Sequence, residues 1–405
     1  MNLLFAWRYF KSKKTTNAVN IIAWISVIAI VVGAGALIVV LSVFNGFEDL
    51  VKGLYGDFYA DIRIAATKGK TIELNTAQLA AIKKTKGVWQ ASLIAEEKAI
   101  LKNEDYQSIV FIKGVDDNYT SVNNIAKHII RGEFDAGKAD VPKLIIGAGI
   151  ENATGINPSM PGYPATIYLP NKKAENLNSI NEAFNSYNLN ASGTFLVQQD
   201  FDNKYVFSNL AFVKFMLDMK PDEYSSLELK TDSTQTDKIA QQLQTLLGNN
   251  YKVETRYQQN QGLYTVMKME KWIIYGILSL ILVVAAFNMI GALTMLVLEK
   301  QKDIAVLKAM GASNFTIRNI FLNEGFLLAF IGGGIGILLA SLICWLQLKF
   351  HLIKLQGGSF IIDYYPVQMR VSDFALVTGT ILFVALLASW IPARKASLQE
   401  FTLKS

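Results

Sequence analysis

The sequence is poor in the residues that usually carry covalent or metal chemistry. Cys344 is the one cysteine among 405 residues, which excludes a disulfide within the chain. The two histidines, His128 and His351, lie far apart and lack the cysteine or carboxylate spacing of a metal site. No G-x-x-x-x-G-K-[ST] motif occurs, so the chain has no P-loop for a nucleotide. We therefore expect no catalytic residue, no metal and no bound cofactor in this chain, and we do not expect an enzyme.

Charged residues are also scarce. They make up 18% of the chain, whereas hydrophobic residues make up 51% and the mean hydropathy is +0.27. This composition is too apolar for an ordinary soluble protein of this length. The formal net charge of +6 comes from scattered Lys and Arg without a dense basic block, which argues against a nucleic-acid partner. The composition favours a membrane protein.

Four long windows contain no charged residue at all. Each reaches the roughly 20 residues that an α-helix needs to cross the hydrocarbon core of a bilayer. We predict transmembrane helices at 17–47, 272–298, 319–348 and 373–392. The windows lie between Lys14 and Glu48, Lys271 and Glu299, Glu324 and Lys349, and Asp373 and Arg394.

The basic residues assign an orientation to these helices. Lys and Arg gather in 1–16, in 299–318 and in the tail 393–405, and short basic segments stay in the cytoplasm. Both termini are therefore expected inside, with 1–16 as an amphipathic helix in the membrane interface. The large segment 48–270 and the short loop 349–372 then lie on the outside.

The large outer segment contains a weak internal repeat. A strand, a helix and a strand are predicted in 57–103, and the same order returns in 222–257. In the second helix Ile239, Leu243 and Leu246 fall on one face at i, i+4 and i+7. Between the repeats, 104–221 is mostly strand-like, and 258–271 runs into the second span without a proline, as a stalk would. The fold class is therefore four transmembrane helices with an α+β extracytoplasmic domain.

Small and polar residues within the spans indicate close helix packing. Gly33 and Gly35 in "GAGA", and Gly332 and Gly336 in "GGGIG", allow helix backbones to approach, either within the chain or between subunits. Asn45 and Asn288 are expected to face protein or a cavity, because an amide facing lipid is costly.

The charged stretch 299–318 separates two spans. Its first charges end the hydrocarbon crossing, and "IAVLKAM" supplies an apolar stripe of Ile304, Leu307 and Met310. Gly311 is a natural stop for this helix, and Ser313 or Asn314 is a suitable N-cap for the next one. We predict a short helix that couples to a cytoplasmic motor, the alternative being a polar turn lying on lipid. Its candidate contact residues are Glu299, Lys300, Asp303, Ile304, Leu307, Met310 and Gly311.

"EKQKDIAVLKAMGAS", followed by "IFLNEGFLLAFIGGGIGILLA", resembles the signature of FtsX-like permeases, the membrane subunits of mechanotransmission ABC transporters. "FAWRYFKSKK", "VVLSVFNGFEDLV" and "LIIGAGIENATGINPS" are similar to the lipoprotein-releasing (Lol) permeases, of LolC or LolE type. The resemblance implies a MacB-like outer domain, with a porter part at 57–103 and 222–257 and a sabre insertion at 104–221.

The resemblance also implies partners. They are a cytoplasmic ABC ATPase dimer that binds ATP and Mg, a second copy or paralogue of the permease, an acylated lipoprotein and a periplasmic chaperone. The expected location is the bacterial inner membrane. Lipoprotein-cavity candidates are Val40, Val43, Phe44, Phe47, Trp272, Tyr275 and Ile277. Candidates for an arm that contacts the chaperone are Asn171, Lys172, Lys173, Asn181, Phe184 and Tyr187.

Two other functions remain open at this stage. A MacB-like exporter would move peptides or small molecules, although in that type the ATPase is fused to the same chain. An FtsX-type signal transducer would activate a cell-wall hydrolase, although its outer domain is usually smaller than 48–270. The homodimeric or heterodimeric state and the LolC-like or LolE-like role also stay open.

Overall fold

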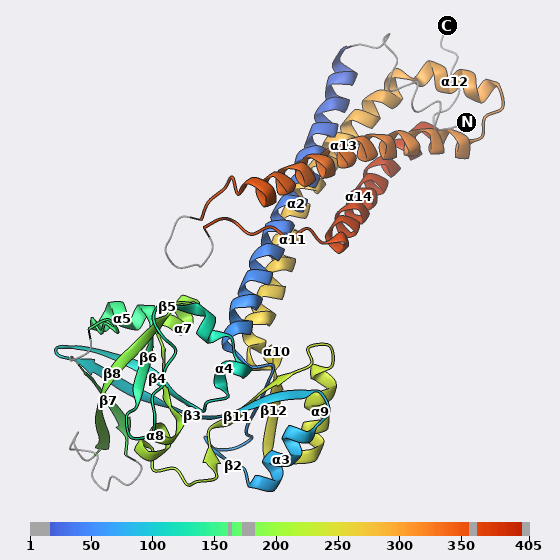
Figure 1. The fold of residues 1–405 in the computed structure, drawn as a ribbon. Helices are drawn as coiled ribbons and strands as arrows, with labels where there is room; N and C mark the ends of the chain where they lie inside the picture. The colour runs from blue at the N-terminus through green and yellow to red at the C-terminus, as the bar shows by residue number, and fades with distance from the viewer. Residues whose placement is uncertain (1–16, 161–163, 172–182, 356–362, 399–405) are drawn as a thin grey trace. The chain divides into compact units, whose positions relative to one another are not determined.

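A computed structural model describes residues 17–160, 164–171, 183–355 and 363–398 (Figure 1). The predicted interfacial helix at 1–16, most of the arm at 172–182 and the tail from 399 lie outside the described residues. The chain divides into two compact units. We call 1–50, 265–355 and 364–405 the helical unit, and 51–264 with 356–363 the α+β unit.

The helical unit contains the four predicted spans. Among the described residues, four helices are long and apolar enough to cross a membrane: α2 (Asn17–Phe58), α11 (Gln261–Glu299), α13 (Asn314–Phe350) and α14 (Val371–Leu398). They extend beyond the charge-free windows because a helix can continue once its charged residues have left the hydrocarbon. The first span was predicted to end at residue 47, but α2 continues to Phe58. The last part of this helix, 51–58, belongs to the α+β unit. The stalk starts at Gln261, since the chain leaves the helix at Asn260 after the short α10 (Arg256–Gln259).

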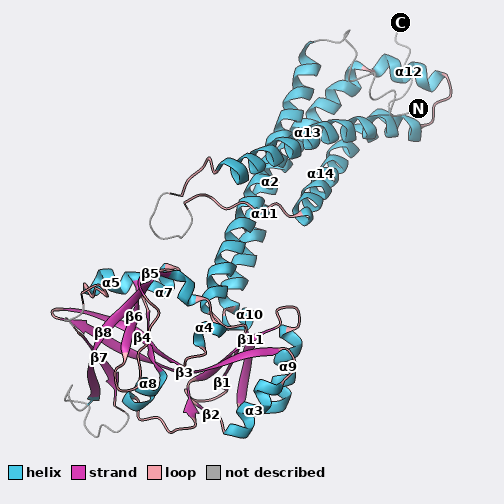
Figure 2. Cartoon of the chain, in the orientation of Figure 1, coloured by secondary structure: helices cyan, strands magenta, loops and turns pink. Residues whose placement is uncertain are grey.

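The two predicted repeats form one end of a continuous sheet (Figure 2). The first is β1 (Ile62–Ala66), α3 (Thr76–Lys84) and β3 (Val88–Asn103); the second is β11 (Ser226–Thr231), α9 (Thr236–Leu247) and β12 (Tyr251–Thr255). Their strands interleave in the order β12-β1-β11-β3, and all neighbours are antiparallel. A small separate sheet pairs β2 (Ile72–Glu73) with β10 (Glu223–Tyr224).

Both repeat helices bury apolar side chains in one core with the strands. Ile82 of α3 and Ile239 and Leu243 of α9 belong to it. The prediction that Leu246 is the third buried residue of α9 is wrong, because Leu246 is 53% exposed. Leu247 packs against the core instead. The face therefore follows i, i+4 and i+8, and the helix stops at Gly248, whose φ is +74°.

The insertion is mostly β, as predicted, and it extends the same sheet. From β3 the order continues as β4-β9-β6-β8-β5, with β7 pairing both β3 and β8. Its strands are β4 (Tyr106–Val115), β5 (Ile129–Gly132), β6 (Lys143–Gly147), β7 (Ala165–Pro170), β8 (Phe184–Phe195) and β9 (Tyr205–Asn209). Short helices connect them: α4 (Tyr119–Val122), the 3-10 turn η1 (Ile125–His128), α5 (Ala148–Thr154), α7 (Gln199–Asp202) and α8 (Leu210–Met216).

A buried ion pair joins the two halves of this sheet. Lys113 on β4 donates to the Glu228 carboxylate on β11 at 2.6 Å, and both residues are at most 3% exposed. The Asn123 amide donates to the other carboxylate oxygen at 2.8 Å. Lys113 Nζ also lies 5.5 Å from the centre of the Phe58 ring, at the end of α2. Removing one partner from such a pair typically costs about 3–5 kcal/mol.

The span glycines pack helices of the same chain against each other. A Cβ on Gly336 of α13 would lie 2.6 Å from the Val31 carbonyl oxygen of α2, and one on Gly332 would lie 2.9 Å from Ile30 Cβ. A Cβ on Gly33 would lie 2.8 Å from Leu282 of α11. The prediction of close helix packing is confirmed for these three glycines. The helices that approach each other there belong to the same chain.

We expect Gly336→Val to lower the stability of the helical unit, because the added methyl groups force α13 away from α2. Overpacking of this kind costs about 1–3 kcal/mol. Gly334→Val is the matched control, since a Cβ on Gly334 meets no heavy atom within 4 Å among the described residues. The measurement is the apparent unfolding temperature of the purified chain in detergent, and an equal loss in both variants would contradict the packing argument.

Candidate functional site

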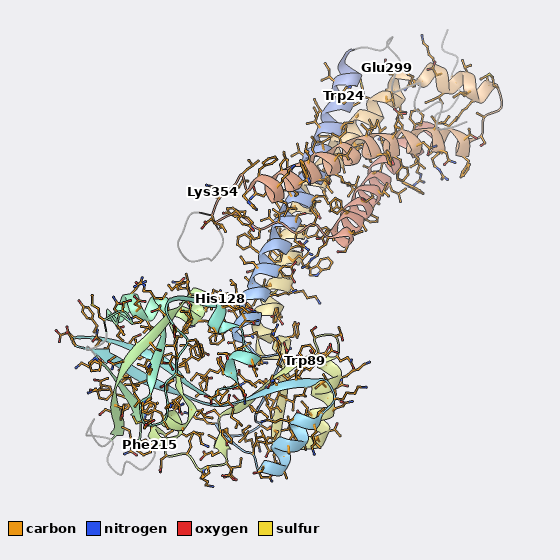
Figure 3. All side chains as sticks on the ribbon, viewed as in Figure 1. Trp24, Trp89, His128, Phe215, Glu299 and Lys354 are labelled. Atoms are coloured by element: carbon orange, nitrogen blue, oxygen red, sulfur yellow. The ribbon has the colours of Figure 1, made fainter. Side chains whose placement is uncertain are left out.

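The stretch 299–318 forms a short helix between two spans. The helix α11 ends at Glu299 (Figure 3), α12 spans Gln301–Ala309, and α13 begins at Asn314. Gly311 has a φ of +94°, and the Ser313 side chain accepts a hydrogen bond from the Thr316 backbone. The predicted stop and cap are confirmed, since glycine adopts positive φ without strain and serine pairs an otherwise free helix N–H.

One face of α12 packs on the adjoining ends of the spans. Ile304 is 3% exposed and belongs to a cluster with Val297, Ile317, Phe321, Ala393 and Ala396. One turn later, Lys308 donates to the backbone oxygen of Ser397, near the end of α14, at 2.9 Å. This contact ties α12 to α14.

The opposite face of α12 is exposed. Val306 is 57% exposed and Met310 is 71% exposed, and they form an i, i+4 pair with Asp303 beside them. The predicted stripe of Ile304, Leu307 and Met310 is thus divided, with Ile304 inward, Leu307 partly buried and Met310 outward. Val306 was not predicted, because apolar residues three apart do not show which side of a short helix faces the protein. Lys300 pairs with Asp303 at 3.6 Å.

A polar cluster joins three spans at the ends opposite to α12. Lys271 of α11 donates to Asn45 of α2 at 2.8 Å and lies 3.1 Å from the Asp373 carboxylate of α14. Asn45 donates to the other Asp373 oxygen at 2.5 Å and to the Gln368 carbonyl at 3.2 Å. Beside this cluster, Arg370 pairs with Glu48 at 3.0 Å and with Asp49 at 2.6 Å. The prediction that Asn45 faces protein is confirmed, whereas Asn288 is exposed on the surface of the single chain.

In the sequence, Lys271 and Asp373 mark the limits of two predicted spans, and their pairing was not predicted. A signal was available, because each borders a charge-free window at the predicted outer end and the two charges are opposite.

The predicted cavity residues lie in different surroundings. Trp272 and Ile277 are exposed on α11, whereas the Tyr275 hydroxyl contacts Thr380 of α14 and its ring packs on the helical core. On α2, Val40, Val43, Phe44 and Phe47 are partly buried, and the Phe47 ring lies 5.7 Å from that of Tyr365. The exposed apolar row of α11 continues with residues that the sequence analysis missed, Leu280, Val284 and Phe287.

The described part of the predicted arm is the base of the β7–β8 hairpin. The Asn171 backbone N–H donates to the Ala183 carbonyl at 2.8 Å, and Phe184 of β8 pairs with Pro170. The Tyr187 ring meets Phe212 of α8 at 5.1 Å, and Phe215 of the same helix is 77% exposed (Figure 3). Lys172, Lys173 and Asn181 lie outside the described residues.

We expect Lys271→Met to destabilise the helical unit, because it leaves the buried Asp373 carboxylate without its cation. The loss expected for a broken buried pair is about 3–5 kcal/mol. Lys271→Met with Asp373→Asn should recover part of it, since no uncompensated charge remains. Lys268→Met is the control, because Lys268 is exposed one turn earlier on α11. The measurement is the free energy of unfolding in detergent. Equal losses for Lys268→Met and Lys271→Met would show that the polar cluster does not stabilise the helical unit.

Two family models match the chain. The MacB-like periplasmic core domain matches residues 23–246, and the FtsX-like permease C-terminal model matches residues 275–401. Curated relatives extend over nearly the whole length. The lipoprotein-releasing system transmembrane protein LolC of Neisseria meningitidis serogroup B is 27% identical, with 97% of this chain and 97% of the relative covered. LolE of Haemophilus influenzae is 26% identical, with 97% of this chain and 96% of the relative covered.

Solved structures match part of the chain at low similarity. The periplasmic region of MacB from Actinobacillus actinomycetemcomitans is 13% identical, covering 53% of this chain and 98% of that chain, with a TM-score of 0.36. The extracellular domain of the transporter YknZ is 12% identical, covering 48% and 99%, with a TM-score of 0.34. Because the core-domain model alone matches more than half of the 405 residues, the chain belongs to the family that combines a MacB-like periplasmic core domain with an FtsX-like permease region.

Proposed function

We propose that this chain is the membrane subunit of an ABC transporter that extracts lipoproteins from the bacterial inner membrane and delivers them to a periplasmic chaperone. The observation that carries the proposal is the nearly full-length similarity to relatives named as lipoprotein-releasing transmembrane proteins. The divided surface of α12 supports it, because one face packs on the spans and the other presents Val306 and Met310.

The energetics require a motor. Moving a lipid anchor out of a bilayer costs roughly 0.8 kcal/mol of free energy per CH2 group. For several acyl chains the cost amounts to tens of kcal/mol. A cargo cavity needs apolar walls and no catalytic group. We infer that a separate ATPase dimer supplies the energy, binds ATP and Mg, and contacts the exposed face of α12. A second permease copy or paralogue completes the cavity, with the exposed row of α11 as one wall.

The contacts within the helical unit suggest how motion crosses the membrane. At the inner end, α12 is attached to α14 through Lys308 and the Ser397 carbonyl. At the other end, α14 is attached to α11 and α2 through Asp373. We infer that α14 acts as a rod between the motor contact and the outer ends of the two spans that border the cavity.

We expect Val306→Asp with Met310→Asp to uncouple the ATPase, because charges at an apolar contact lose the burial of both side chains. ATP-dependent release of a lipoprotein from vesicles that contain the ATPase should fall at least about tenfold, since each side chain contributes roughly 1.5–3 kcal/mol when fully buried. Co-purification of the ATPase should fall with it. Val371→Asp is the control, because Val371 is 85% exposed at the opposite end of the helical unit. Normal release by the double variant would contradict this assignment.

The β7–β8 hairpin is the proposed chaperone contact. Replacing 172–182 by Asn-Gly keeps the pairing of Asn171 with Ala183 and removes the segment between them. We expect transfer to the chaperone to be lost, while stimulation of the ATPase by lipoprotein remains. The measurement is the amount of lipoprotein that passes from vesicles into the soluble chaperone complex. Undiminished transfer would contradict the assignment of the hairpin as the chaperone contact.

A further inference from the structure

The α+β unit contains a hollow of about 270 Å³ that the proposed mechanism does not use. Three segments line it. Tyr55 and Tyr59 come from the end of α2, Phe201 and Tyr205 from α7 and β9, and Gly262 from the start of α11. Both α2 and α11 continue as the first and second spans. The hollow therefore lies between the parts of these two helices that belong to the α+β unit.

Four aromatic rings line one part of its wall, those of Tyr55, Tyr59, Phe201 and Tyr205. The Phe201 ring lies 4.9 Å from the Tyr55 ring and 5.6 Å from the Tyr59 ring, in edge-to-face geometry. Burial, reinforced by the charge of Glu96, raises the pKa of Tyr59 to about 12, so its hydroxyl remains a donor at physiological pH. A Cβ on Gly262 would meet no heavy atom within 4 Å among the described residues, so the helix leaves open space there.

One corner of the hollow contains an unpaired polar group. Asn260 lines it, and its amide nitrogen is buried without a hydrogen-bond partner among the described residues. A buried donor without a partner costs about 1–3 kcal/mol, so an acceptor brought here after a small rotation of the Asn260 side chain would be favoured. Asn260 lies between the end of α10 and the start of α11, outside the hydrogen-bonded body of both helices.

The size of the hollow restricts its occupant. Its 270 Å³ equals the share of about nine water molecules, at roughly 30 Å³ each. That volume holds one or two amino-acid residues, whereas several acyl chains do not fit. Aromatic walls with a peptide-type donor suit an extended peptide, in which an apolar side chain enters the hollow and a backbone carbonyl accepts from Asn260.

We propose that this hollow binds the extended peptide that follows the acylated cysteine of the cargo. The inference rests on the proposed function, because only an acylated cargo in the cavity between the spans would place its peptide along α2 and α11. A subsite there makes the transporter respond to peptide as well as to lipid. The exposed charges of Asp200 and Lys204, 3.4 Å apart at the rim, leave the sequence of the peptide loosely specified.

Photocrosslinking of the full-length chain in nanodiscs tests the site. Benzoylphenylalanine in place of Lys204 reports on the hollow, and in place of Lys252, which is exposed on β12, it is the control. The probes are the acetylated peptide Ser-Leu-Ser-Asn-Ala and the same peptide attached to triacylated cysteine. We expect both probes to crosslink at 204 and not at 252, the acylated one at much lower concentration.

A substitution that fills the hollow provides the second test. Gly262→Leu should reduce crosslinking of both probes at 204 about tenfold, the effect of losing roughly one buried apolar side chain. Gly53→Leu is the matched control, since Gly53 also faces open space on a helix of this unit but does not line the hollow. Unfolding temperatures of both variants verify that they fold.

The outcomes separate the two proposals. Absence of crosslinking at 204, or crosslinking that Gly262→Leu leaves unchanged, overturns the peptide site whatever the acylated probe does. If the plain peptide crosslinks at 204 in a manner that depends on Gly262, while acylation brings no gain in affinity, the peptide site stands and lipoprotein release fails as the function.

Discussion

The charged contact between Lys271 and Asp373 is the constraint on which the helical unit depends. It joins α11 to α14, and Asn45 brings α2 into the same cluster. A charge left alone among packed helices is expensive, so these three helix ends are expected to stay together through any motion. The exposed side of α11, with Leu280, Val284 and Phe287, lies outside this cluster, which agrees with its proposed place as a cavity wall.

This cluster and the Lys308 contact lie at opposite ends of α14, so that helix is in contact with α12 at one end and with α2 and α11 at the other. Pro392 lies inside α14, close to the end attached to α12. A proline removes one backbone hydrogen bond and weakens the helix locally. The proposed rod is therefore weakest near its contact with α12, and the longer part of α14 towards Asp373 is the stiffer segment.

The sequence predicts those features that local pattern determines. Charge-free windows locate the four spans, Gly311 and Ser313 mark the turn after α12, and the repeated strand-helix-strand order gives the two halves of the sheet. Tertiary choices are not encoded locally. Whether Ile304 or Val306 faces the spans depends on the ends of α11, α13 and α14, and the pairing of Lys271 with Asp373 joins windows about a hundred residues apart. For the same reason α9 buries Leu247 rather than Leu246.

The strand β3 makes the α+β unit one mechanical piece. Its first half pairs with β11 of the repeats, and its second half pairs with β4 and β7 of the insertion. The buried pair of Lys113 and Glu228 crosses the same junction, beside Phe58 at the end of α2. A porter and an insertion joined by a loop would absorb a displacement of α2, whereas a continuous hydrogen-bonded sheet transmits it. The β7–β8 hairpin is therefore expected to move together with the end of α2, as one body within the α+β unit.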